Sequence, residues 1–142
     1  MIPNLNFAAS DSRARYFQIR GIGERSGYQG TPNTSIAFLI DDVDYSGQGG
    51  IATTFDIDQI EGYRSPQGSR IGANALAGLI YIKTKDPTES FEGTSELMFG
   101  NYGTGSAGIA FGGPINENKN IKYRLALRKD YSNGFRKNIY LN

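Results

Sequence analysis

The stretch QIEGYRSPQGSRIGANALAGLIYIKTK, residues 59–85, contains two candidate strands joined by a corner. The first candidate ends near Arg64, where Pro66, Gln67 and Gly68 are typical of a turn. Small residues follow, with weak helical character, and the Ile-rich run at 79–85 then predicts a second strand. The 27 residues of this stretch therefore predict a compact unit of a strand, a corner and a second strand.

The segments before this stretch predict further short strands separated by glycine-rich loops. We expect residues 1–15 to be irregular and residues 16–22 to form a strand that ends in glycines. The continuous apolar run at 36–43 predicts a strand that is covered on both faces. Loops are expected at 23–35 and 44–54, and a turn followed by a strand at 56–64. Together these elements predict an α+β domain with a small mixed sheet and short helices, ending near Pro87.

Beyond Pro87 the pattern changes to alternation of apolar and polar residues with a period of two. One parity holds the larger side chains: Leu97, Phe99, Ala107, Ile109, Phe111, Tyr123, Leu125 and Leu127. Such alternation fits half of an antiparallel sandwich or the wall of a membrane barrel, and the pattern alone does not separate the two.

Composition excludes several classes of protein. The 142 residues include 15 basic and 14 acidic side chains, so the net charge of +1 argues against a nucleic-acid-binding protein. The absence of cysteine excludes disulfides and thiolate chemistry. Without histidine the commonest general base is also missing, and we do not expect an enzyme.

The order of these elements resembles the TonB-dependent outer-membrane receptors. That family has an I-E-V-x-R-G-P-x-G motif, a Gly/Ala-rich segment and then G-x-I-x-I-x-T-K. Three departures are small substitutions: Gly62, Ser65 and Ala77. The positions that match the family pattern are Ile60, Glu61, Arg64, Pro66, Gln67, Gly68, Gly72, Ala75, Gly78, Ile80, Ile82, Thr84 and Lys85.

The resemblance implies a plug domain at residues 1–87, with its N-terminus truncated, followed at 88–142 by the first strands of a transmembrane β-barrel. The chain is expected to be an internal piece of a longer one, because it opens inside the plug pattern and stops inside a strand pattern. The whole receptor would be a barrel of about 22 strands in the outer membrane of a Gram-negative bacterium. It would take up a scarce nutrient such as a ferric siderophore or cobalamin, energised through TonB with ExbB and ExbD, and it would need no cofactor.

The resemblance also implies two sets of functional residues. Charged contacts that hold the plug inside the barrel are expected from Arg20, Glu61 and Arg64. The glycine-rich loops are expected to face the ligand, and the candidate ligand contacts are Arg25, Tyr28, Gln29 and Tyr45.

Two alternatives and one further cluster remain. A soluble β-rich binding or structural domain would have the same alternating strands, and a hydrolase built on a carboxylate pair has no supporting spacing. The carboxylates Asp41, Asp42 and Asp44 lack the ligand spacing of a calcium loop. We expect them to be a solvated or hydrogen-bonded strand end.

Overall fold

The computed structural model describes residues 3–9, 14–25, 34–48, 54–72 and 74–134. The chain divides into two compact units, Met1–Thr84 and Lys85–Asn142, and each is described by itself. Within the described residues, no helix has the length and apolar character needed to cross a membrane.

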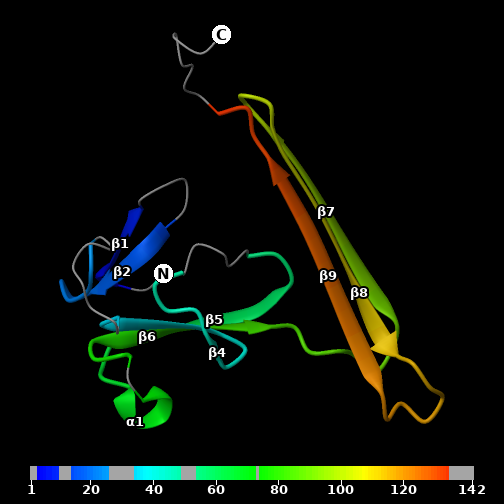
Figure 1. The fold of residues 1–142 in the computed structure, drawn as a ribbon. Helices are drawn as coiled ribbons and strands as arrows, with labels where there is room; N and C mark the ends of the chain where they lie inside the picture. The colour runs from blue at the N-terminus through cyan, green and yellow to red at the C-terminus, as the bar shows by residue number, and fades with distance from the viewer. Residues whose placement is uncertain (1–2, 10–13, 26–33, 49–53, 73, 135–142) are drawn as a thin grey trace. The chain divides into compact units, whose positions relative to one another are not determined.

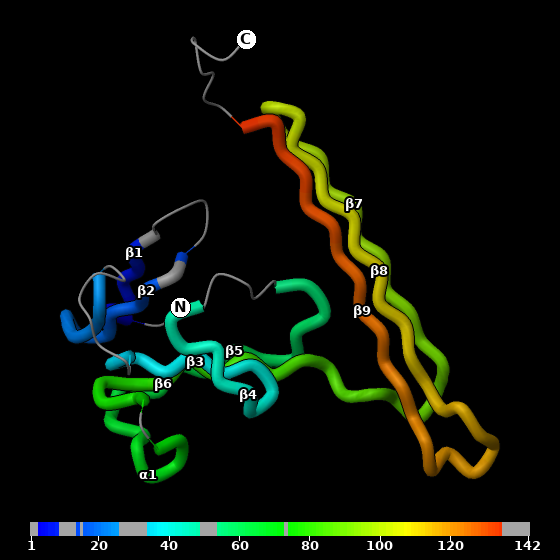
Figure 2. The backbone as a smooth tube through the Cα atoms, in the orientation of Figure 1, coloured from blue at the N-terminus to red at the C-terminus, as the bar shows by residue number. Residues whose placement is uncertain are grey.

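The first unit is built on a four-stranded mixed sheet. Its strands are β3 (Ile36–Ile40), β4 (Val43–Asp44), β5 (Ile57–Tyr63) and β6 (Gly78–Thr84), in the order β4-β3-β6-β5. The two central strands, β3 and β6, run parallel, whereas the two edge strands pair antiparallel with them (Figure 2). Because β3 and β6 are covered on both faces, their sequences are nearly continuous apolar runs.

Each face of this sheet has its own core. On one face lies a hairpin of β1 (Leu5–Ala9) and β2 (Ala14–Ile19), which packs against β3 and β6 (Figure 1). The rings of Phe17 and Phe38 stack there with centroids 5.4 Å apart. Ile19 is fully buried there. On the other face, Ala37, Leu39, Ala75 and Leu79 form a second cluster, next to the single helical turn α1 (Gly68–Ile71). Burial on both faces fixes the register of the central strands.

Two expectations for this unit were wrong. Residues 1–15 were expected to be irregular, but Leu5–Ala9 form β1 and β2 begins at Ala14, and this hairpin packs on the sheet. The segment 36–43 is not one strand, because Asp41 and Asp42 take φ angles of 47° and 67° and turn the chain into a tight hairpin. A two-residue hairpin turn of type I′ needs positive φ at both central positions, which Asp tolerates better than most residues.

The strand predicted at 16–22 ends earlier than expected. It stops at Ile19, where a tight turn through Arg20 and Gly21 brings Ile22 back to pair with Ile19.

The second unit is an antiparallel sheet, called the long sheet below. It consists of β7 (Glu92–Gly100), β8 (Thr104–Pro114) and β9 (Lys122–Tyr131), with β8 in the middle (Figures 1 and 2). The register of both pairs runs without interruption, so side chains of one parity share one face throughout. We call the face of the odd-numbered residues the apolar face, and that of the even-numbered residues the charged face.

The predicted alternation is confirmed. On the apolar face the large side chains are mostly exposed, as for Leu97 (71%) and Phe99 (85%). On the charged face of β8, Ser106 and Ala110 are buried. The strands have 9, 11 and 10 residues, close to the length of about 9–11 that a tilted strand needs to cross a bilayer.

Gly78, at the start of β6, provides a test of the packing between the sheet and the hairpin. A Cβ atom there would collide with the backbone oxygen of Tyr63 and lie 2.8 Å from Cδ1 of Ile19. We predict that Gly78→Ala lowers the free energy of unfolding by about 1–3 kcal/mol, the usual cost of overpacking. Urea-induced unfolding of the chain in non-ionic detergent, followed by near-UV circular dichroism, measures it.

The matched control is Gly68→Ala. Nothing lies within 4 Å of a Cβ at Gly68, in the helical turn α1, so this variant should match the wild type or exceed it slightly. Equal stability of the two variants would show that the close approach at Gly78 contributes nothing.

Candidate functional site

The charged face of the long sheet holds a ladder of ion pairs that cross the middle strand. Side chains on β7 reach those on β9 over β8, although the two outer strands are not neighbours. The crossing pairs are Glu92–Arg124 at 3.1 Å and Glu96–Arg128 at 2.8 Å. Arg128 also pairs with Asp130 of its own strand at 3.0 Å, and these five residues are called the charge ladder.

Glycines in β8 clear the path for the ladder. Gly112 lies in register between Glu92 and Arg124, and Gly108 lies between Glu96 and Arg128. A Cβ atom at Gly112 would lie only 2.9 Å from Cα of Arg124. Because β7 and β9 are two strand spacings apart, roughly 9.5 Å, only long side chains crossing a bare backbone can meet.

The arginines of the charge ladder are more buried than those of ordinary surface ion pairs. The side chains of Arg124 and Arg128 are only 7% and 15% exposed, and Arg128 also donates a hydrogen bond to Oγ of Ser106 at 3.2 Å. Partly desolvated cations need their partners, since an unpaired one is costly. At the start of the sheet Lys122 pairs with Glu89, and its hydrogen bond and charge lower the pKa of that carboxyl.

Sequence reasoning missed the charge ladder. The alternation beyond Pro87 was expected, but no partners were predicted for Arg124 and Arg128. The signal was present, because Glu92 and Glu96, Gly108 and Gly112, and the two arginines are all spaced by four residues. Equal even spacing on three consecutive strands predicts aligned rows once the hairpin registers are known.

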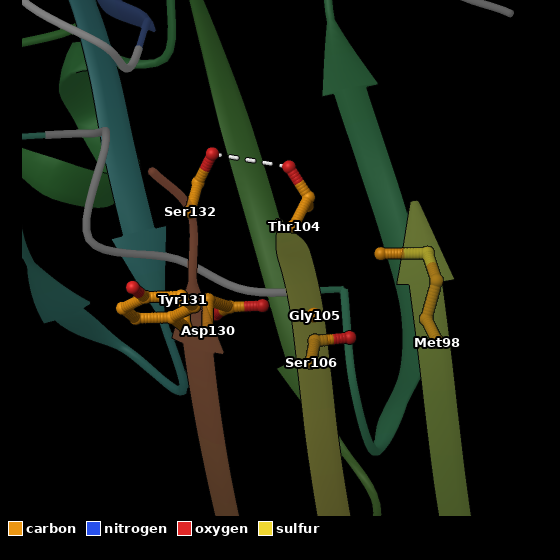
Figure 3. A pocket seen from close by; sticks show the side chains of 7 residues that line it. All are labelled: Met98, Thr104, Gly105, Ser106, Asp130, Tyr131 and Ser132. Atoms are coloured by element: carbon orange, nitrogen blue, oxygen red, sulfur yellow. Dashed lines mark hydrogen bonds between the residues drawn. The ribbon is translucent and has the colours of Figure 1, made fainter. Parts of the chain in front are cut away.

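A hollow of about 240 Å³ lies at the other end of the charged face (Figure 3). Thr104 and Ser132 share a hydrogen bond of 3.0 Å, and Ser106 and Asp130 stand on adjacent strands beside them. Hydroxyls and a carboxylate can bind a hydroxylated or amide-bearing ligand. The hollow is lined by Met98, Thr104, Gly105, Ser106, Asp130, Tyr131 and Ser132.

The three predicted lock residues lie on the first unit and are not brought together. Arg20 is exposed in the turn after β2, at a φ of 55°. Arg64 is exposed just past the end of β5. Glu61 is half-buried on β5, where it accepts hydrogen bonds from Nε2 of Gln59 at 2.6 Å and from the hydroxyl of Tyr63.

Glu61 belongs to a polar network that the sequence did not predict. The guanidinium of Arg70 lies over the rings of Tyr63 and Tyr81, 5.7 and 5.6 Å from their centroids. A hydrogen bond with the Tyr63 hydroxyl raises the pKa of Arg70. Burial, followed by the nearby charge of Asp42, raises the pKa of Tyr81. The network holds α1 against the sheet through cation–π contacts.

The predicted ligand contacts are only partly described. Arg25 is exposed, and Tyr45 is half-buried with its side chain packed against the core of the first unit. Tyr28 and Gln29 lie outside the described residues.

The carboxylates near the β3–β4 turn are hydrogen-bonded. Asp41 accepts from the backbone N–H and hydroxyl of Thr84, at 2.9 and 2.6 Å. Asp44 accepts from Ser46 and Asn74; although partial burial opposes the effect, these hydrogen bonds lower its pKa. Among the residues that the structure describes, no three His, Cys, Asp or Glu side chains gather as a metal site would require.

Comparison with known proteins yields a family model and several relatives. Residues 1–79 match the family described as the TonB-dependent receptor plug domain. The ferripyoverdine receptor of Pseudomonas aeruginosa is 26% identical over 123 residues, which are 86% of this chain and 14% of that receptor. The chain therefore spans about one seventh of that relative.

Solved structures show the same fold. The pyoverdine outer-membrane receptor FpvA of P. aeruginosa, bound to pyoverdine, superposes with a TM-score of 0.73 at 20% identity over 94% of this chain and 19% of its own. The alcaligin outer-membrane receptor FauA of Bordetella pertussis gives 0.71 at 19% identity over 92% of this chain and 22% of its own. The predicted fold class, an α+β plug followed by antiparallel strands, is confirmed. These relatives are receptors and not enzymes.

The charge ladder can be tested by exchanging its charges. We predict that Arg124→Glu destabilises the long sheet, because it places two carboxylates against each other over Gly112. The double variant Glu92→Arg/Arg124→Glu should recover most of the loss, with a coupling of about 0.5–3 kcal/mol in the double-mutant cycle. Urea midpoints of the chain in detergent give the four free energies.

Glu117→Arg is the charge control for the single variant Glu92→Arg, since both replace an acid by a base and Glu117 is exposed in the turn between β8 and β9. It should leave the midpoint unchanged. If the effects of the two single variants on the free energy of unfolding were additive, the Glu92–Arg124 pair would contribute nothing to stability.

Proposed function

The chain belongs to the TonB-dependent receptors, whose plug domain its residues 1–79 match, and we propose that it supplies the plug and first wall strands of a siderophore transporter energised through TonB. The transporter would lie in the outer membrane of a Gram-negative bacterium and take up a ferric siderophore. The observation that carries the proposal is the succession, in one chain, of a plug fold and a sheet with one apolar and one charged face.

The two faces of the long sheet support the barrel part of the proposal. Barrel strands in outer membranes alternate apolar residues toward lipid with polar residues toward the lumen, and aromatic side chains flank the apolar band. The apolar face has this arrangement. Phe99 and Tyr131 lie near one end, Phe111 and Tyr123 near the other, and Leu125 and Leu127 between them.

The relatives support the class of ligand. They are receptors for pyoverdine and alcaligin, so a siderophore is the cargo that the comparisons favour over cobalamin. The alternative of a soluble β-rich domain is not supported, because the family match covers more than half of the chain.

The roles of the predicted site residues form part of the proposal. We propose that Arg20 and Arg64, both exposed cations, pair with carboxylates of the barrel lumen and hold the plug in place. Glu61 would act with them, although part of its hydrogen-bonding capacity is used by Gln59 and Tyr63. Arg25 and Tyr45, together with Tyr28 and Gln29, would contact the ligand.

Uptake of labelled iron tests the function. The full-length receptor is expressed in a Gram-negative host without its own siderophore receptors, and the probes are ⁵⁵Fe-labelled ferripyoverdine and ⁵⁵Fe-labelled ferric alcaligin. We predict uptake of at least one probe, and loss of uptake but not of cell-surface binding in a host lacking TonB.

Two results would contradict the proposal. Uptake that persists without TonB would indicate a passive pore. A receptor that reaches the outer membrane but binds neither probe would remove the siderophore assignment.

A further inference from the structure

The apolar face of the long sheet contains one charged side chain. The structure describes every residue of β7, β8 and β9, and in those strands Lys129 is the sole ionisable acid or base of odd number apart from tyrosines. It lies in register with Ala107 and Leu97. An ammonium group facing lipid costs about 2–4 kcal/mol at the bilayer midplane and about 0–1 kcal/mol near the interface.

Lys129 lies near the end of the apolar band, where the free-energy cost of exposing an ammonium group to lipid is small. It lies two residues before Tyr131. Tyr131 and Phe99 are both in register with Gly105 of β8, so Lys129 is close to an aromatic end of the apolar band. A lysine at such a level extends its ammonium toward the headgroups while its methylenes stay on apolar surface. In the described part of the chain, the side chain of Lys129 makes no hydrogen bond or ion pair.

A hollow of about 370 Å³ opens beside this lysine. It exists because the middle strand has the small residue Ala107 between Leu97 and Lys129, while the next pair, Ile109 and Leu127, is large. The hollow is lined by Leu97, Ala107, Gly108, Ile109, Leu127, Arg128 and Lys129.

This combination selects a particular kind of occupant. The walls of the hollow are aliphatic side chains, which suit an acyl chain, and the cation at its edge suits an anion. A molecule with both features is a membrane lipid whose phosphate is attached to acyl chains. The positive charge of Lys129 and its position near the aromatic end of the apolar band both favour a lipid over a protein partner.

We propose that this hollow is a specific binding site for a phosphate-bearing membrane lipid, with one acyl chain over Ala107 and the phosphate on Lys129. The site rests on the proposed outer-membrane location. It differs from general lipid contact because it requires both the charge and the depression. Each of the two can be removed separately.

The experiment uses the full-length receptor, delipidated in detergent, with 1-palmitoyl-2-oleoyl phosphatidylglycerol as the probe and native mass spectrometry to count bound lipid. Lys129→Gln removes the cation, and Ala107→Leu fills the hollow while keeping the cation. Each should weaken binding of one lipid molecule by roughly tenfold, and Lys129→Arg should retain that molecule. A neutral diacylglycerol with the same chains should not bind at this site.

Each remaining outcome would overturn the site. Equal lipid retention in all variants would mean that the barrel binds lipid without a specific site. Loss of binding in Lys129→Gln alone would mean that the charge attracts lipid and that the hollow contributes nothing. Equal binding of the neutral lipid would remove the role of the phosphate. If the wild-type receptor did not assemble in membranes at all, the proposed function itself would fail, and heat-modifiable migration on gels detects that case separately.

Discussion

The ion pairs that cross β8 over its glycines are the interaction on which the long sheet depends. Arg124 and Arg128 are nearly buried on a face made of small residues, and their carboxylate partners come from a strand that is not adjacent. Backbone hydrogen bonds join each strand only to its neighbour, whereas these pairs join β7 directly to β9. They also collect the charge on one face, which leaves the other face free for apolar contact.

The first unit meets a different constraint. Its central strands are parallel and lie between two covers, the β1–β2 hairpin and the α1 corner. Covers on both faces make the sheet a rigid support, on which loops and turns can carry exposed cations such as Arg20 and Arg64. The polar network around Arg70 holds the corner against the sheet through two tyrosine rings.

Much of this architecture could be predicted from the sequence because its signals are local. The corner at Pro66–Gly68 and the alternation at Tyr123, Leu125 and Leu127 follow from turn chemistry and strand periodicity. The β1 strand could not be predicted, because it depends on pairing with β2 and on packing of the hairpin against the sheet through Leu5 and Phe17. The turn at Asp41 and Asp42 was not predicted, because it interrupts a run that otherwise has the pattern of a single apolar strand. The charge ladder depends on the register between strands, which no single segment encodes.

The central claim is that the long sheet separates lipid from lumen by residue parity. The chain has no cysteine, so a single one can be introduced at Leu125, Ala126 or Leu127 for nitroxide labelling in the full receptor, with any cysteines elsewhere in it removed. Electron paramagnetic resonance in bilayers then measures collision with oxygen, which concentrates in lipid. The account predicts high oxygen accessibility at 125 and 127 and low accessibility at 126. Equal values at the three positions, or a maximum at 126, would contradict it.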